Sequence, residues 1–261
     1  MNKQQIQACG DELFNAMTSR KVIRPLTETY TDISIDDAYH ISLRMLEQRL
    51  AAGERVIGKK IGVTSKAVQN MLNVHQPDFG YLTDKMAYSQ GEEMPISQLL
   101  MQPKAEGEIA FILKKDLMGP GITNADVLAA TECVMPCFEV VDSRIDNWQI
   151  KIQDTVADNA SCGLFVLGDR AVDPRKVDLA TCGMVVEKNG SVISTGAGAA
   201  ALGSPVNCVA WLANTLGAFG IGLKAGEVIL SGSLVPLEPV KAGDFMSVSI
   251  GGIGSASVRF I

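Results

Sequence analysis

The stretch that most constrains the fold of this 261-residue chain is KAEGEIAFIL, residues 104–113. Its length and apolar character are typical of a β-strand, yet it contains two glutamates, Glu106 and Glu108. Side chains at positions i and i+2 project from the same face of a strand, so these two carboxylates should lie side by side. Ala110 and Ile112 continue that face and are apolar. Because buried acids require a compensating cation, either water or a cation must lie over this face.

The sequence around this strand predicts an α+β fold, with helices first and strands afterwards. Residues 3–20 and the segment from Ser34 to Gly53 have apolar residues at helical spacing, and Ser34 with Asp37 forms a capping-box pattern. From Val56 onward the sequence is rich in β-formers and interrupted by glycines. We therefore expect a helical N-terminal segment, residues 1–55, and a β-rich domain, residues 56–261, although the length suits one domain as well as two.

Within the β-rich part, turn and cap signals predict the order of the elements. We expect a strand and turn over 56–64, a short helix over 65–72, a loop over 75–82 held by Pro77 and Gly80, a helix over 124–133, a strand over 135–142, a hairpin at Asn189-Gly190, a helix over 204–216 and no helix afterwards.

Composition excludes several classes of function. Acidic residues outnumber basic ones by 29 to 23, and no run of Lys and Arg suits the phosphates of a nucleic acid. No stretch is long and apolar enough for a signal peptide or a membrane span. The six cysteines lack C-x-x-C spacing, which indicates reduced, buried thiols in a cytoplasmic protein. With only two histidines, a zinc site of the usual kind is excluded, so any metal must be held by oxygen.

A third carboxylate on a neighbouring strand would complete an oxygen site for Mg²⁺ or Mn²⁺. The segment CFEVVDSR offers Glu139 inside an apolar pattern and Asp142 at its end, and the pattern alone leaves both open. The alternative is that Glu106 and Glu108 simply mark the solvent face of an amphipathic strand.

Two other motifs are weaker signals. In VIGKKIGVT, a regular strand directs either Lys59 or Lys60 inward, where it could bind a carboxylate substrate, but an exposed basic pair is an equal alternative. The glycine-rich stretch 196–205 departs from the dinucleotide-binding pattern, and we interpret it as a loop with close backbone packing. No nucleophile elbow with a histidine partner and no phosphate-binding loop is present.

Four motifs in order, KAEGEIAFIL, CFEVVDSR, DNASCG and AGEVILSGS, resemble the fumarylacetoacetate hydrolase superfamily. Within it the chain resembles the hydratase/decarboxylase family, and there the hydratases of 2-hydroxypenta-2,4-dienoate (2-oxopent-4-enoate) from the meta-cleavage degradation of aromatic compounds. The resemblance runs from Gly10 to Ile261. It implies a mixed sheet or roll in the β-rich domain.

The resemblance also implies roles for particular residues. Glu106, Glu108 and Glu139 correspond to the metal ligands, which leaves Asp142 a supporting or exposed role. Lys60, rather than Lys59, corresponds to the inward lysine. The remaining assignments are Asp78 as a catalytic residue lining the pocket and Ser161 as a substrate-binding residue.

The implied reaction is hydration of the 2-hydroxydienoate, or its 2-oxo tautomer, to 4-hydroxy-2-oxopentanoate, with the metal chelated by the C1 carboxylate and the C2 oxygen. We expect Lys60 to hold the carboxylate or carry a proton, and Asp78 to act as general base. One alternative is 2-oxo-3-hexenedioate (4-oxalocrotonate) decarboxylase, and another is a non-catalytic partner subunit. The resemblance further implies a homo-oligomer built on pentameric rings and a complex with the decarboxylase.

Overall fold

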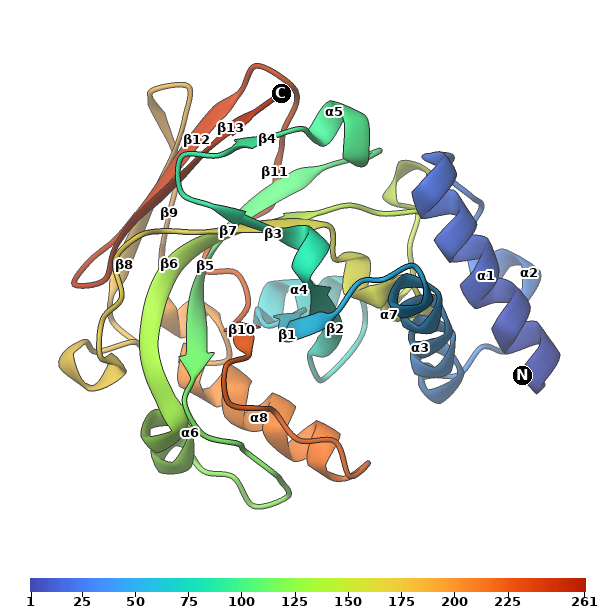
Figure 1. Ribbon diagram of the computed structural model, residues 1–261, viewed down its shortest axis with the longest axis horizontal. Helices are drawn as coiled ribbons and strands as arrows, with labels where there is room; N and C mark the ends of the chain where they lie inside the picture. The colour runs from blue at the N-terminus through green and yellow to red at the C-terminus, as the bar shows by residue number, and fades with distance from the viewer.

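The computed structural model describes residues 1–261 and consists of a helical N-terminal part beside two β-sheets (Figure 1). The helices are α1 (Lys3–Ser19), α2 (Leu26–Thr29), α3 (Ile35–Ala51), α4 (Lys66–Met71), α5 (Ile96–Leu99), α6 (Asn124–Ala130), α7 (Ile152–Ala157) and α8 (Pro205–Gly217). The strands are β1 (Val56–Gly62), β2 (Asp78–Thr83), β3 (Ala87–Ser89), β4 (Glu93–Met94), β5 (Lys104–Leu113), β6 (Thr131–Val141), β7 (Leu164–Leu167), β8 (Gly183–Lys188), β9 (Ser191–Ala197), β10 (Val228–Leu230), β11 (Glu238–Pro239), β12 (Phe245–Ile250) and β13 (Gly254–Phe260). The predicted α+β class, helices first and strands afterwards, is confirmed.

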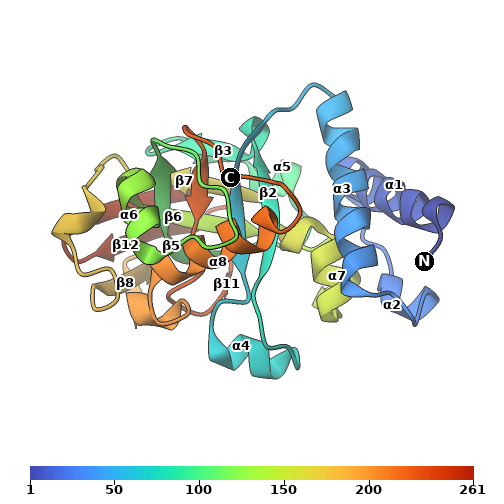
Figure 2. The same ribbon diagram turned by 90° about the horizontal axis from the view of Figure 1, so that it is seen from below.

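The N-terminal helices form where the capping signals predicted them. Ser34 accepts a hydrogen bond from the backbone N–H of Asp37 while the Asp37 carboxylate accepts from that of Ser34, which completes the capping box of α3. Leu13 on α1 and Ile41 on α3 are fully buried in a small core that also includes Val156 of α7. Figure 2 shows α1 to α3 to one side of the sheets, with α7 between. Helix α7 thus joins the helical part to the rest of the molecule.

The larger sheet has eight strands in the order β2-β1-β10-β5-β6-β7-β3, with β11 added to β5. Its two longest strands, β5 and β6, are antiparallel and curve together around the interior (Figure 1). The second sheet, in the order β4-β13-β12-β8-β9, packs near one end of them. Its hairpin turns at Asn189 and Gly190, both with positive φ (54° and 82°), as their sequence predicted.

Two predicted boundaries are wrong. Residues 78–82, predicted to lie in a loop, belong to the fully buried strand β2 (Asp78–Thr83). Gly80 lets β2 lie against the turn at Asn159, because a Cβ on Gly80 would come within 2.4 Å of the Asn159 carbonyl oxygen. The helix predicted over 124–133 ends at Ala130, since Thr131 already begins the β6 ladder. Pairing with β5 overrides the helical pattern of the last residues.

Other local predictions are confirmed. The glycine-rich stretch begins in β9, which ends at Ala197, and leaves it as a turn whose close backbone packing was predicted: a Cβ on Gly198 would lie 1.7 Å from the Leu179 carbonyl oxygen. Helix α8 begins with Pro205 at its first position, and no helix follows it. All six cysteines are unpaired, and all except the half-buried Cys133 are buried. No helix combines the length and the apolar character that crossing a bilayer would require.

Candidate active site

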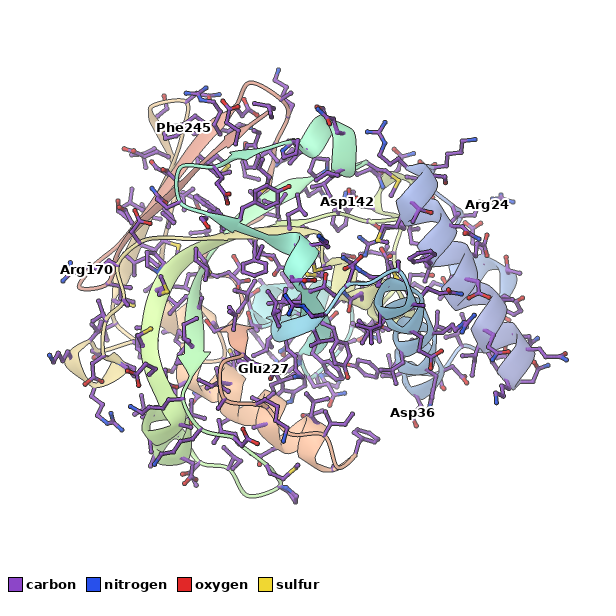
Figure 3. All side chains as sticks on the ribbon, in the orientation of Figure 1. Arg24, Asp36, Asp142, Arg170, Glu227 and Phe245 are labelled. Carbon is purple, nitrogen blue, oxygen red and sulfur yellow. The ribbon has the colours of Figure 1, made fainter.

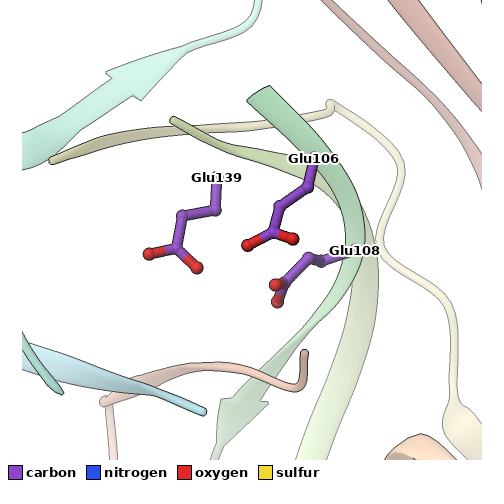
Figure 4. Close-up of side chains that lie close together, drawn as sticks. All are labelled: Glu106, Glu108 and Glu139. Atoms are coloured by element: carbon purple, nitrogen blue, oxygen red, sulfur yellow. The ribbon is translucent and has the colours of Figure 1, made fainter. Parts of the chain in front are cut away.

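Three glutamates from β5 and β6 converge on one point inside the larger sheet. Glu106 and Glu108 project from the same face of β5, and Glu139 on β6 is the direct cross-strand partner of Glu106. One oxygen from each of the three carboxylates lies within 4.8 Å of the others. Figure 4 shows all three side chains directed to the same side of the sheet. The period of the strand and the register of the β5–β6 pair together produce this cluster.

The carboxylate cluster has fewer hydrogen-bond donors than its oxygens need. Glu108 and Glu139 are fully buried, and Glu106 is half-buried. Glu108 Oε2 accepts a hydrogen bond from the Gly232 N–H at 2.8 Å, and Glu139 Oε1 has only its ion pair with Lys60. Glu108 Oε1 and Glu139 Oε2 have no partner. Buried oxygens without partners are costly, and a cation would compensate them. The residues present therefore suit a divalent cation that prefers oxygen ligands.

The electrostatics of the carboxylate cluster agree with that interpretation. Burial, reinforced by the charge of Glu139, raises the pKa of Glu106 to about 7. Burial, together with Glu139 and Glu106, raises the pKa of Glu108 well above its ordinary value. Without a cation, these acids would hold protons near neutral pH. A divalent ion would instead keep them ionised.

The two consecutive lysines of β1 are both buried and lie on opposite faces of the strand. Lys60 Nζ lies 3.1 Å from Glu139 Oε1, while Lys59 Nζ contacts both carboxylate oxygens of Glu227 at 2.7 and 2.8 Å. Burial alone would lower the pKa of Lys60, but Glu139 and other nearby acids outweigh it and raise that pKa. The alternative of an exposed basic pair is wrong, because both lysines are buried. Glu227, labelled in Figure 3, neutralises Lys59.

Asp78 lies beside Lys60. It is the first residue of β2, opposite Gly62 of β1, it is buried, and its Oδ1 has no hydrogen-bond partner. A Cβ built on Gly62 would lie 2.3 Å from Asp78 Oδ1 and 3.4 Å from Lys60 Nζ, so both groups flank the same point. Burial raises the pKa of Asp78 to about 6, with Lys60 opposing the shift and Glu139 adding to it.

Ser161 ends a tight turn, Asn159–Ser161, in which all three residues have positive φ. The Asn159 carboxamide accepts from the Tyr81 N–H at 2.8 Å and donates to the Tyr81 carbonyl at 3.0 Å, which fixes the turn on β2. The buried Ser161 hydroxyl contacts the Thr155 hydroxyl at 3.0 Å. Left-handed backbone at three consecutive non-glycine residues is strained and persists only where surrounding contacts hold it.

Two buried charged groups around this turn are structural. Asp142, labelled in Figure 3, is buried and accepts hydrogen bonds from the N–H groups of Met101 (3.0 Å) and Gln102 (2.6 Å). An exposed role for Asp142 is therefore wrong, and its supporting role is to anchor the chain before β5. Arg144 pairs with Asp158 and donates to the Cys162 carbonyl at 3.0 Å. No motif in the sequence indicated this ion pair.

A pocket of about 290 Å³ lies at Asp78, the acid beside Lys60. It is lined by Ile35, Tyr39, Val74, His75, Gln76, Pro77, Asp78, Ile152 and Val156. Ile35 and Tyr39 belong to α3, so the helical N-terminal part forms one wall. This wall was not predicted from the sequence, although the i, i+4 spacing of Ile35 and Tyr39 does put both side chains on one face of the helix.

The chain is similar to proteins of one family over most of its length. The family model "Fumarylacetoacetate (FAA) hydrolase C-terminal" matches residues 55–261. A 2-hydroxypent-2,4-dienoate hydratase from Pseudomonas putida is 80% identical over 221 residues, which is 85% of this chain and 100% of that relative. A 2-hydroxyhexa-2,4-dienoate hydratase from Comamonas testosteroni is 60% identical over 99% of this chain and 98% of its own.

A solved structure agrees over the whole fold. The 4-oxalocrotonate decarboxylase from Pseudomonas putida G7, complexed with magnesium and adipate, superimposes with a TM-score of 0.96 at 38% sequence identity. The match covers 100% of this chain and 99% of that one.

Proposed function

The chain belongs to the fumarylacetoacetate hydrolase family, and from this premise we propose that it is a hydro-lyase, the hydratase that converts 2-hydroxypenta-2,4-dienoate (2-oxopent-4-enoate) to 4-hydroxy-2-oxopentanoate in the meta-cleavage degradation of aromatic compounds. The observation that carries the proposal is the carboxylate cluster, with buried, unpartnered oxygens beside the buried cation Lys60. The two relatives that are 80% and 60% identical to this chain are named as hydratases.

We propose Glu106, Glu108 and Glu139 as the ligands of a divalent cation, either Mg²⁺ or Mn²⁺. The decarboxylase of similar fold binds magnesium. When bound, such an ion supplies Lewis acidity toward the C1 carboxylate and C2 oxygen of the substrate.

Lys60 and Asp78 are the proposed catalytic residues. In the reaction the enol O–H proton is lost and C5 gains a proton, then water adds its OH to C4 and a proton to C3. The charged Lys60 ammonium holds the substrate carboxylate, and its burial strengthens that attraction. With a pKa of about 6, Asp78 is largely ionised at neutral pH yet basic enough to accept a proton from water or the enol.

Ser161 is proposed as a substrate-binding residue because its strained turn is fixed against β2, the strand that carries Asp78. The division into a helical segment, residues 1–55, and a catalytic domain, residues 56–261, likewise stays a proposal. The match of the family model to residues 55–261 supports it.

Turnover of a single substrate tests the function. Purified protein with Mg²⁺ or Mn²⁺ and freshly generated 2-hydroxypenta-2,4-dienoate should remove the dienol absorbance and form 4-hydroxy-2-oxopentanoate. Release of CO₂ from 2-oxo-3-hexenedioate, without hydration of the dienoate, would instead assign the decarboxylase activity. Inactivity toward both substrates would favour the non-catalytic partner subunit.

We also propose a homo-oligomer based on pentameric rings, an association with 4-oxalocrotonate decarboxylase and a cytoplasmic location. The exposed apolar side chains of Met118, before α6, and Phe219, after α8, support a contact surface. The unpaired cysteines support a reducing compartment.

Metal binding should depend on pH. In the metal-free protein, the raised pKa values of Glu106, about 7, and Glu108 mean that these carboxyls carry protons at and below neutral pH. A cation must displace these protons, so its affinity should rise with pH and fall by about tenfold or more per unit below pH 7. Calorimetry in buffers of different ionisation enthalpy measures the protons released. Affinity independent of pH between 5.5 and 8 would contradict the assignment of the ligands.

A further inference from the structure

The pocket beside Asp78 is built from parts of the chain that are distant in sequence. Ile35 and Tyr39 come from α3, Val74 from the segment before β2, and Ile152 and Val156 from α7. The polar lining residues are His75, Gln76 and the acid Asp78, and no lysine or arginine lines the pocket. The reaction proposed above assigns no role to these apolar side chains.

This pocket is linked to the carboxylate cluster through two residues. Asp78 belongs to its lining, and Asp78 and Lys60 flank the space beside Gly62. Lys60 in turn contacts Glu139. Asp78, Lys60 and Glu139 thus form a continuous series of neighbours from the pocket to the carboxylate cluster.

The wall from the helical part has a fixed position. The Tyr39 ring stacks on Phe79, the neighbour of Asp78 in β2, with centroids 4.4 Å apart and planes 14° from parallel. Val156 is buried in the small core shared by α1, α3 and α7. The size of the pocket is thus set by packed side chains.

We propose that this pocket receives the C5 end of the substrate, an inference that rests on the proposed function. Four side chains would then determine which 2-hydroxydienoates are hydrated: Ile35, Tyr39, Val74 and Ile152. Apolar walls favour an alkyl substituent on C5, since each buried methylene adds binding energy. A carboxylate there would lie beside the acid Asp78, in a pocket whose basic side chain is the exposed His75 and which has no lysine or arginine, so a carboxylate is disfavoured. The pocket therefore selects monocarboxylate dienoates, with or without a C5 alkyl group, over dicarboxylates.

Binding of saturated 2-oxo acids, which cannot be hydrated, tests the pocket separately from turnover. With Mg²⁺-loaded protein, calorimetric affinity should rise about fourfold per methylene from 2-oxopentanoate to 2-oxoheptanoate. The dicarboxylate 2-oxohexanedioate should bind at least about tenfold more weakly than 2-oxohexanoate. Val74→Phe should remove the gain per methylene. Its matched control is Val192→Phe on β9, at an exposed site in the other sheet.

Turnover gives the second readout. The ratio of kcat/KM for 2-hydroxyhexa-2,4-dienoate to that for 2-hydroxypenta-2,4-dienoate should fall about tenfold or more in Val74→Phe. Ile152→Ala enlarges the pocket and should raise the relative rate with 2-hydroxyhepta-2,4-dienoate, whereas Ile193→Ala on β9 should not. Ile152→Ala also provides the test if Val74→Phe fails to fold.

The two proposals fail in different ways. If the unmodified protein hydrates no dienoate, the proposed function is wrong. If it hydrates 2-hydroxypenta-2,4-dienoate, yet the affinity series and the rate ratios are the same in the pocket variants and their β9 controls, the assignment of this pocket is overturned.

Discussion

Glu106→Gln should abolish divalent-metal binding and nearly all hydratase activity while the protein stays folded. An amide supplies a weaker, neutral ligand, so we expect metal affinity to fall by at least about 100-fold. Loss of the Lewis acid should lower kcat/KM by about 10³-fold. Calorimetric titration with Mg²⁺ or Mn²⁺ and the dienol assay measure the two effects.

The same variant should be at least as stable as the unmodified protein without metal. Burial raises the pKa of Glu106, and Glu139 raises it further, so a neutral amide removes a cost at neutral pH. Mg²⁺ should raise the melting temperature of the unmodified protein but not that of Glu106→Gln. The matched control is Glu187→Gln, an exposed glutamate on β8 that should retain full activity. Unchanged activity in Glu106→Gln, or after complete chelation, would disprove the metal centre.

Lys60→Met should lower kcat/KM for 2-hydroxypenta-2,4-dienoate by about 10²–10³-fold, because it removes a buried positive charge directed at the substrate carboxylate. Metal affinity should stay the same or increase, since the variant loses a cation that competes for Glu139 at 3.1 Å. Steady-state kinetics beside metal titration separate these effects. A parallel loss of metal binding and activity would instead make Lys60 a support for the metal ligands.

Lys59→Met is the matched control, because it makes the same substitution one residue earlier on the same strand. It should leave the Glu227 carboxylate buried without its partner and destabilise the fold by about 3–5 kcal/mol, as measured by chemical denaturation. The folded fraction should keep its kcat. If Lys59→Met lowers kcat more than Lys60→Met does, the assignment of Lys60 to the active site is wrong.

Local features of the sequence predicted local features of the structure well. Some features depend only on interactions within a few residues and can be predicted without knowledge of the fold. These are the capping box of Ser34 and Asp37, the Asn189-Gly190 turn and the proline at the start of α8. Strand β2 was missed because its pairing with β1 and its contact with the Asn159 turn are long-range. The choice between a supporting and an exposed role for Asp142 stayed open for the same reason, since its hydrogen-bond donors lie about forty residues away along the chain.

The candidate site likewise has features that the sequence predicted and features that depend on the fold. The alternation of a strand by itself determined that Glu106 and Glu108 share a face, and the motif resemblance pointed to Glu139 and Lys60. Only the tertiary structure decided that Glu139 is paired with Glu106, that the two lysines have different buried partners, and that α3 contributes a wall of the pocket. The physical reason is that the direction of a side chain follows from local backbone geometry, whereas its partners depend on strand register and on packing between segments far apart in the chain.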